Sequence, residues 1–238
     1  MYIKLILKIL SLFDYFLKIK VINFFKKEKI DQLDIFIDVG SHHGETIKIF
    51  NKYFKIKKLF AFEASPINYK VLQKKIKISN YPTVEIYNKA LGEKKEKLFL
   101  NQFKETQSTT FLPFNQNSKY LIKKKKILSP YTENFFLKKI EIDVERLDEF
   151  LQNRNIKVID ILKIDTEGFD FNVIKGLGEK ISQTRYIYFE HHFDDMIKKN
   201  YKFSDIHNYL VKKNFFMVFK IKMMFRKTFE YIYCNNNL

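Results

Sequence analysis

The stretch Phe36-Ile-Asp-Val-Gly-Ser-His-His-Gly44, followed by Leu59-Phe-Ala-Phe-Glu63, decides the fold class of this chain. An apolar run ends in Asp38, a turn with two glycines and a helix-like stretch follow, and a second apolar run ends in Glu63. Strands connected in this way lie parallel, and ligands bind outside their carboxyl ends. The stretch therefore predicts a nucleoside-shaped pocket at one edge of an α/β sheet.

The turn itself narrows the class of ligand. Gly40 and Gly44 let the backbone turn sharply and let a ligand approach where a Cβ would clash, and the first N–H groups of the following helix face that ligand. The phosphate-binding patterns G-x-x-x-x-G-K-[ST] and G-x-G-x-x-G are both absent, since His42 stands where the second needs a glycine. Asp38 suits a cationic ligand without phosphate, such as S-adenosylmethionine, and Glu63 can accept hydrogen bonds from both ribose hydroxyls.

Composition limits the size of the fold and the choice of partners. The 238 residues, of which 46% are hydrophobic, suffice for one α/β domain with a core. The single cysteine excludes an internal disulfide and indicates a reducing compartment. A formal charge of +17 is typical of proteins that bind nucleic acid or an anionic membrane, but the excess is nearly all lysine. Phosphate-binding surfaces usually carry more arginine, so the composition of an AT-rich genome explains the charge better, and we expect no nucleic-acid partner.

Residues 2–27 are expected to form one basic amphipathic helix. Its polar positions recur every three or four residues, at Lys4, Lys8, Ser11, Asp14 and Lys18. These charges interrupt the apolar runs too often for a membrane span of about 20 residues, and no cleavage site of a secretory signal follows. The helix either packs on protein or lies in the plane of an anionic bilayer. We therefore expect a cytoplasmic protein, with peripheral contact at the inner face of the membrane if the helix binds lipid.

The rest of the chain alternates between strands and helices. Strands are expected at 34–39, 58–63, 83–90, 139–144, 158–164 and 186–190, and helices at 44–54, 66–78, 169–181 and 203–213. A hairpin partner of the third strand is expected at 96–100, an irregular region at 101–137 with a solvated lysine run at 123–126, and a closing antiparallel pair at 215–222 and 227–233. The alternation predicts a mostly parallel, doubly wound sheet with a C-terminal antiparallel strand pair.

Several blocks complete the opening motif and together resemble a known family. They are F-E-A-S-P at 62–66, N-K-A-L-G at 88–92, Leu147-Asp148, L-K-I-D-T-E-G at 162–168 and a strand that ends in Glu190. In this order, over roughly residues 34–192, they resemble the FkbM family of S-adenosylmethionine-dependent methyltransferases. The resemblance implies a Rossmann-like methyltransferase domain at 31–238, preceded by the helix at 1–30. It also implies methyl transfer to a hydroxyl of a sugar, glycan or related small molecule.

The resemblance assigns roles to individual residues. Those expected to bind the cofactor are Asp38, Gly40, Ser41, Gly44, Glu63, Ala64, Asn88 and Ala90, with Asn88 and Ala90 beside the adenine. Those expected at the point of methyl transfer are Asp165, Glu167 and His191, and the general base among them is left open. His42 and Ala64 depart from the family pattern, which puts the turn geometry in question.

Three alternatives accompany this interpretation. Histidines and carboxylates are abundant, with His42 and His43 at the expected pocket rim, but no H-x-x-x-H or H-E-x-x-H spacing occurs, so we expect no metal site. An RNA methyltransferase would fit the charge, yet the N-P-P-Y type motif is absent. A non-catalytic basic module at a membrane surface is the third, and the intact set of carboxylates argues against it.

Overall fold

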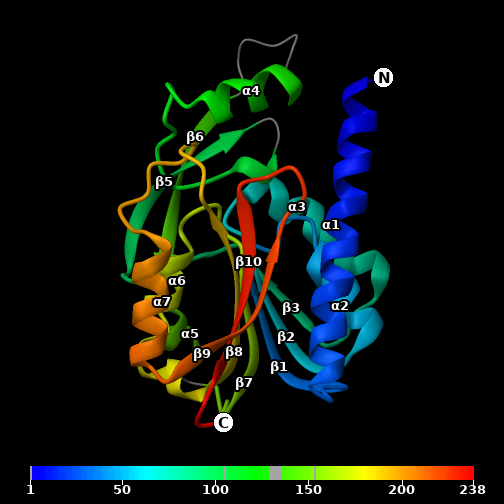
Figure 1. The fold of residues 1–238 in the computed structure, drawn as a ribbon. Helices are drawn as coiled ribbons and strands as arrows, with labels where there is room; N and C mark the ends of the chain where they lie inside the picture. The colour runs from blue at the N-terminus through cyan, green and yellow to red at the C-terminus, as the bar shows by residue number, and fades with distance from the viewer. Residues whose placement is uncertain (1, 104–105, 129–135, 153) are drawn as a thin grey trace.

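The computed structural model describes residues 2–103, 106–128, 136–152 and 154–238, and contains a central seven-stranded sheet (Figure 1). Its order is β3-β2-β1-β7-β8-β10-β9. The strands are β1 (Gln32–Val39), β2 (Lys55–Phe62), β3 (Val84–Tyr87), β7 (Ile159–Ile164), β8 (Thr184–His192), β9 (Phe215–Lys222) and β10 (Thr228–Asn235). The first five in this order run parallel, whereas β10 runs antiparallel to both β8 and β9. The predicted doubly wound sheet with a C-terminal antiparallel pair is confirmed.

Helices cover both faces of the sheet (Figure 1). One face carries α1 (Tyr2–Lys27), α2 (Glu45–Tyr53) and α3 (Pro66–Ser79), and the other carries α5 (Leu147–Gln152), α6 (Asp170–Lys175) and α7 (Phe203–Lys212). The start of α3 follows from its sequence, since the Ser65 hydroxyl accepts from the Asn68 backbone N–H and Pro66 occupies the first turn. The expected helix at 169–181 is instead α6 and a short 3-10 segment (Gly178–Gln183), because glycines at 176 and 178 interrupt it.

A second, three-stranded sheet has the order β4-β6-β5, with β4 (Ala90–Leu91), β5 (Glu96–Phe103) and β6 (Phe136–Glu145). The prediction that the segment at 96–100 forms a hairpin with the third strand was wrong, because β5 pairs antiparallel with β6 and β3 ends at Tyr87. The region at 101–137 was also expected to be irregular throughout. It contains a 3-10 turn (Thr106–Ser108) and α4 (Lys119–Leu128), which carries the lysine run at 123–126, while residues 104–105 and 129–135 lie outside the described part.

Alternation along the strands separates two hydrophobic clusters. Phe36, Ile161 and Tyr188 face α1, α2 and α3, whereas their neighbours Ile37 and Leu162 belong to the cluster on the opposite face. Side chains of successive strand residues point to opposite faces. The parity of a residue in a strand therefore decides to which of the two layers its side chain belongs.

The second half of α1 is part of the core. The most buried residues in this half are each at most 6% exposed: Leu17, Val21, Ile22 and Phe25. The centroid of the Phe25 ring lies 6.2 Å from that of Phe50 on α2 and 5.3 Å from that of Tyr186 on β8. It also lies 6.4 Å from that of Phe54, which directly follows α2. Of the two alternatives for this helix, packing on the domain therefore holds for its second half. No helix in the part of the chain that the structure describes is long and apolar enough to cross a bilayer.

This packing predicts that α1 contributes to the stability of the whole domain. Phe25→Ala should lower the free energy of unfolding by about 3–5 kcal/mol, because it leaves a cavity between α1, α2 and β8. Urea denaturation followed by circular dichroism would measure it. The matched control is Phe16→Ala on the same helix, where the residue is 54% exposed and the change should stay below about 0.5 kcal/mol. Equal effects of the two substitutions would show that α1 does not share the core.

Candidate active site

A cavity of about 540 Å³ lies at the carboxyl ends of β1, β2, β7 and β8. This volume falls within the range of pockets that hold nucleoside-sized ligands. Its wall includes the glycine turn after β1, the β4–β5 region, α1 and the turn between β9 and β10. Because β10 runs antiparallel, its first residues lie at the same edge of the sheet.

The polar groups of the cavity come from one face of the sheet. On the α1 face, each central strand changes from apolar to charged residues at its last positions. The charged residues on this face are Asp38 of β1, Lys163 of β7, Glu190 and His192 of β8, and Glu230 of β10. Because side chains alternate along each strand, these residues lie on the same face of the sheet, and the positions of the strand ends bring them to one edge.

Lys163 is buried between two carboxylates. Its Nζ lies 3.1 Å from Asp38 Oδ1 and 3.4 Å from Asp165 Oδ2, with only 6% of the side chain exposed. Burial alone would lower the pKa of Lys163, but the two carboxylates raise it above its usual value. Burial would raise the pKa of Asp165, yet Lys163 keeps it below its usual value. Lys163 and Asp165 thus stay ionised, and the ammonium connects the end of β1 to the loop after β7.

The glycine turn is shaped mainly by its contacts with protein. The backbone N–H groups of Gly40 and Ser41 both donate to the Phe62 carbonyl, at 2.9 and 3.0 Å. A Cβ on Gly40, whose φ is +78°, would lie 1.9 Å from the Asp165 carbonyl oxygen, so only glycine allows β1 to approach β7 this closely. Gly44 begins α2 with φ +83° and packs against α3 rather than lining the cavity.

Glu63 lines the cavity at the end of β2, and hydrogen bonds from the backbone hold its carboxylate in place. Its carboxylate accepts from the backbone N–H groups of His42 and Ser65, at 2.8 and 2.9 Å. Burial raises the pKa of Glu63, and these hydrogen bonds oppose that shift. The Asn88 side chain donates to the carbonyls of Glu63 and Ala64 and does not line the cavity. Asn88 thus holds the backbone at Glu63, whereas Ala64 and Ala90 form part of the wall.

A strained loop after β7 presents Glu167. This residue has φ 49°, a left-handed conformation that side-chain-bearing residues rarely adopt. Asp170, which the sequence reasoning missed, accepts hydrogen bonds from the Thr166 and Gly168 backbone N–H groups, at 2.9 and 3.2 Å. Thr110, which forms an isolated bridge with Asn101 of β5, donates to the Glu167 carbonyl at 2.8 Å. The loop is therefore fixed on both sides, and Glu167 faces the cavity.

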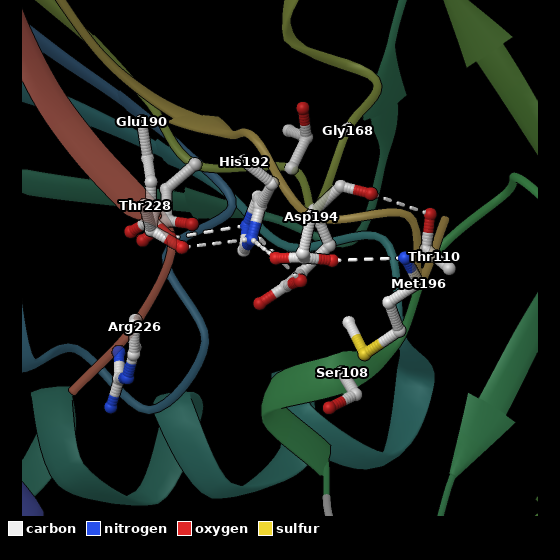
Figure 2. Close-up of polar contacts among 12 residues, drawn as sticks. Ser108, Thr110, Gly168, Glu190, His192, Asp194, Met196, Arg226 and Thr228 are labelled. Atoms are coloured by element: carbon white, nitrogen blue, oxygen red, sulfur yellow. Dashed lines mark hydrogen bonds and ion pairs between the residues drawn. The ribbon is translucent and has the colours of Figure 1, made fainter. Parts of the chain in front are cut away.

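His192 lies among three carboxylates beside the cavity, and Figure 2 shows its ring between Glu190 and Asp194. Its Nε2 is 3.1 Å from Glu190 Oε1 and 3.5 Å from Glu167 Oε2, and its Nδ1 is 3.6 Å from Asp194 Oδ2. Burial alone would lower the pKa of His192, but these carboxylates raise it well above its usual value. Burial also raises the pKa of Glu167 to about 7, which His192 opposes. The imidazole is thus positively charged at neutral pH, next to a carboxyl that is half ionised.

The structure does not bring His191, one of the residues expected at the transfer point, to the cavity. Its side chain points to the opposite face of β8, where its ring lies 4.8–6.0 Å from the rings of Phe193, Tyr201 and Phe203. Burial lowers the pKa of His191 to about 3, so it stays neutral. Glu190 faces the cavity, and side chains alternate along β8. His192 therefore lies on the same face as Glu190, whereas His191 lies on the opposite face.

The N-terminal helix contributes to the site, which no motif predicted. Asp14 and Lys18, both on its polar stripe, line the cavity together with Arg226 from the β9–β10 turn. Arg226 donates to Asp14 at 2.9 Å across 212 positions of sequence. The part of the stripe at Ser11, Asp14 and Lys18 therefore faces the cavity.

At the rim, His42 lines the cavity and its Nε2 lies 2.8 Å from the Thr106 hydroxyl, whereas His43 does not line it. Ligand atoms of His42, His43 and Glu45 lie within 4.8 Å of one another, a cluster of the size that a cation needs. The expectation that no metal is required stays a prediction.

The residues fit a cationic nucleoside. Asp165 exposes 37% of its side chain and Glu63 lines the same cavity, so carboxylates can reach a sulfonium, an amino group and ribose hydroxyls. Neither Asp38 oxygen accepts a hydrogen bond of good geometry, although Lys163 lies within ion-pair distance. Asp38, which was expected to bind the cofactor, is fully buried and does not line the cavity, so it acts on the cavity through Lys163.

Comparisons with known proteins agree with this geometry. Residues 38–217 match the model of the methyltransferase FkbM domain. Methyltransferase 1 of Beauveria bassiana (strain ARSEF 2860) is 25% identical over 147 residues, and the match covers 60% of this chain and 58% of that protein. This chain thus spans well under two thirds of that relative.

Solved structures show the same fold. Methyltransferase FkbM from Methylobacillus flagellatus KT superposes with a TM-score of 0.55 at 14% identity, covering 85% of this chain and 43% of that one. Magnesium protoporphyrin IX methyltransferase (ChlM) from Synechocystis PCC 6803, solved with bound SAM, gives 0.53 at 8% identity and covers 95% and 79%. At such identities the likeness shows the fold alone.

The buried ion group predicts a large effect of removing its cation. Lys163→Met should lower the free energy of unfolding by roughly 3–5 kcal/mol, because it leaves the buried Asp38 without a counter-charge and removes the partner of the half-buried Asp165. Urea denaturation measures the loss, and adding Asp38→Asn should restore part of it. The control is Lys58→Met on β2, whose side chain is 45% exposed and whose loss should cost under about 1 kcal/mol. An unchanged Lys163→Met protein would contradict the role assigned to this lysine.

Proposed function

Because this chain belongs to the family of FkbM methyltransferase domains, we propose that it transfers a methyl group from S-adenosylmethionine to a hydroxyl of a sugar, glycan or related small molecule. The family, the methyltransferase class and the fold predicted from the sequence are confirmed by this membership. S-adenosylmethionine is the cofactor of this family and supplies an electrophilic methyl group on a sulfonium. The observation that carries the proposal is Glu167, a carboxyl with a pKa of about 7 that faces the same cavity as Glu63 and Asp165.

Methyl transfer to a hydroxyl is an in-line displacement. The acceptor oxygen forms a bond to the methyl carbon as the carbon–sulfur bond breaks, and the hydroxyl proton passes to a base. The protein therefore has to hold the oxygen in line with that carbon and accept one proton.

Glu167 is the best candidate for the base. Its pKa near 7 makes the ionised form available at neutral pH and still able to take up a proton. His192 is already protonated, because three carboxylates surround it, so it stabilises the Glu167 carboxylate and orients it. Asp165 has a lowered pKa and is paired with Lys163, which suits it to face a cationic group rather than to accept the proton.

The cofactor's place follows from the acids that line the cavity. Glu63 offers carboxylate oxygens at the end of β2 for the ribose hydroxyls, and Asp165 faces the side where the sulfonium would lie. Gly40 and Ser41 form the floor between them. The methyl group of a cofactor held in this way would lie on the side of the cavity that Glu167 faces, which supports Glu167 as the base.

The acceptor half of the cavity favours an uncharged, hydroxyl-bearing molecule. Glu190, Glu230 and Asp14 line it in addition to Glu167. Burial raises the pKa of Glu230 to about 8, so this carboxyl is neutral at pH 7 and can donate a hydrogen bond. Carboxyl groups that donate and accept match the hydroxyls of a sugar, and Lys18 and Arg226 of the same wall can donate to sugar oxygens as well. These groups support a glycan-type acceptor.

Cofactor binding tests the first part of the proposal. Calorimetry should show that the wild-type chain binds S-adenosylmethionine and that Glu63→Gln binds it about 10- to 100-fold more weakly, because one charged hydrogen-bond acceptor for the ribose is lost. Glutamine can keep only one of the hydrogen bonds to His42 and Ser65, because the two N–H groups donate to different oxygens of Glu63 and an amide nitrogen cannot accept, so circular dichroism should confirm that the variant is folded. Glu85→Gln on β3, a surface position, should bind like wild type. A wild-type protein without measurable affinity would overturn the proposed function.

The base assignment predicts a pH dependence. A carboxylate accepts a proton only when ionised, so methyl transfer should rise as the pH passes about 7, the pKa of Glu167, and fall below it. Transfer of labelled methyl groups to a panel of sugars and nucleotide sugars would measure this. Glu167→Gln should reduce the turnover by about 10²- to 10⁴-fold and leave affinity for S-adenosylmethionine within about threefold. Retention of the turnover, or an unchanged pH profile, would assign the base elsewhere.

A further inference from the structure

The turn between β9 and β10 exposes two large apolar residues, and its backbone is strained at one of them. Met224 and Phe225 are 52% and 74% exposed, and exposed lysines stand on both sides of them at 222 and 227. Phe225 has φ 63°, a conformation that costs an aromatic residue energy. Neither burial in the chain nor a relaxed backbone explains a phenylalanine at this position, so its exposure requires another reason.

The first half of α1 exposes apolar residues as well. Leu12 and Phe16, which lie one helical turn apart, are 53% and 54% exposed, and the exposed Lys20 continues the same line. In Figure 1 the start of this helix stands apart at the right of the domain, at about the height of α4. Its opposite side carries Asp14 and Lys18 toward the cavity.

The two segments are joined into one surface. The ring of Phe13 meets that of Phe225 edge to face, with centroids 5.4 Å apart, and Asp14 binds Arg226 at 2.9 Å. Leu12, Phe16, Met224 and Phe225, here called the apolar edge, therefore surround a contact between α1 and the turn. The same two segments contribute Tyr15, Met223 and Arg226 to the cavity wall, so the apolar edge borders its opening.

We propose that the apolar edge rests in the headgroup region of an anionic lipid bilayer, so that the cavity opens toward the membrane surface. An apolar edge flanked by lysines is the pattern of a peripheral membrane contact, since apolar side chains enter the interface and the ammonium groups meet anionic headgroups. The lysines at 20, 222 and 227 stand around the edge, and the whole chain carries a formal charge of +17. This contact goes beyond the methyl-transfer function and does not depend on it.

The charge also distinguishes a membrane from a second copy of the chain. Two copies meeting at this edge would bring their lysines together and repel each other, whereas anionic headgroups neutralise them. The second half of α1 stays in the protein core, so the contact needs no insertion of the helix. The result is a contact at the surface of the bilayer through one end of α1 and one turn.

Co-sedimentation of the full chain with vesicles tests the proposal. With phosphatidylcholine vesicles that contain about 30% phosphatidylglycerol, most of the wild-type protein should pellet, and raising the salt or omitting the anionic lipid should release it. The triple variant Leu12→Ser, Phe16→Ser, Phe225→Ser should bind at least about tenfold more weakly. Phe225→Gly should weaken binding too, and it relieves the strained φ, so loss of folding would not account for its effect.

Matched controls separate this contact from the other conclusions. Phe99→Ser removes an equally exposed phenylalanine, 59% exposed, from β5 and should bind vesicles like wild type. All variants should keep their affinity for S-adenosylmethionine, so failure of the cofactor experiment and failure of this one are independent. Wild-type protein that stays in the supernatant would overturn the proposal. So would a triple variant that binds vesicles unchanged, or one that merely converts a dimer to a monomer in sedimentation velocity.

Discussion

The buried ammonium of Lys163 is the contact on which the rest of the site depends. It joins the carboxylates of Asp38 and Asp165, which end neighbouring central strands, at the point where the sheet reverses its order. Without its charge, the buried Asp38 would lack a counter-charge and Asp165 would lose the cation that lowers its pKa. Gly40 serves the same junction through its backbone, since no larger residue fits against the Asp165 carbonyl. Charge and close approach together bring Asp165 and Glu167 to the cavity.

Much of this could be predicted from the sequence, because strand ends and turns carry local signals. The apolar runs before Asp38, Glu63 and Asp165 located the strands, and their parallel arrangement placed these acids at one edge. The alternation of side chains along a strand was a signal that the prediction did not use. Glu190 and His192 have the same parity on β8, so placing the first in the pocket already implies the second and directs His191 to the other face. Lys163 carried a signal too, as a charged residue inside an otherwise apolar strand.

Other features could not be predicted, because they depend on contacts between distant segments. Nothing near Asn88 shows that its amide would hold the backbone of Glu63 instead of facing a ligand. The pairing of β5 with β6, rather than with the nearer β3, is decided by how the second sheet packs over the cavity. The pKa of Glu167 arises from burial under that sheet and from His192, twenty-five positions away along the chain. Such effects appear only when the chain is folded.

The ion pair between Asp14 and Arg226 has a consequence for when the site comes into being. These residues are 212 positions apart, and both line the cavity. A ribosome adds residues in order, so the glycine turn and the first strands emerge long before β10 and its turn can close on α1. The central parallel strands can pair earlier, but this part of the cavity wall stays open until β10 and the turn before it have been made. The wall is therefore completed by two segments 212 positions apart, and a nascent chain that has not yet reached Arg226 holds an incomplete cavity.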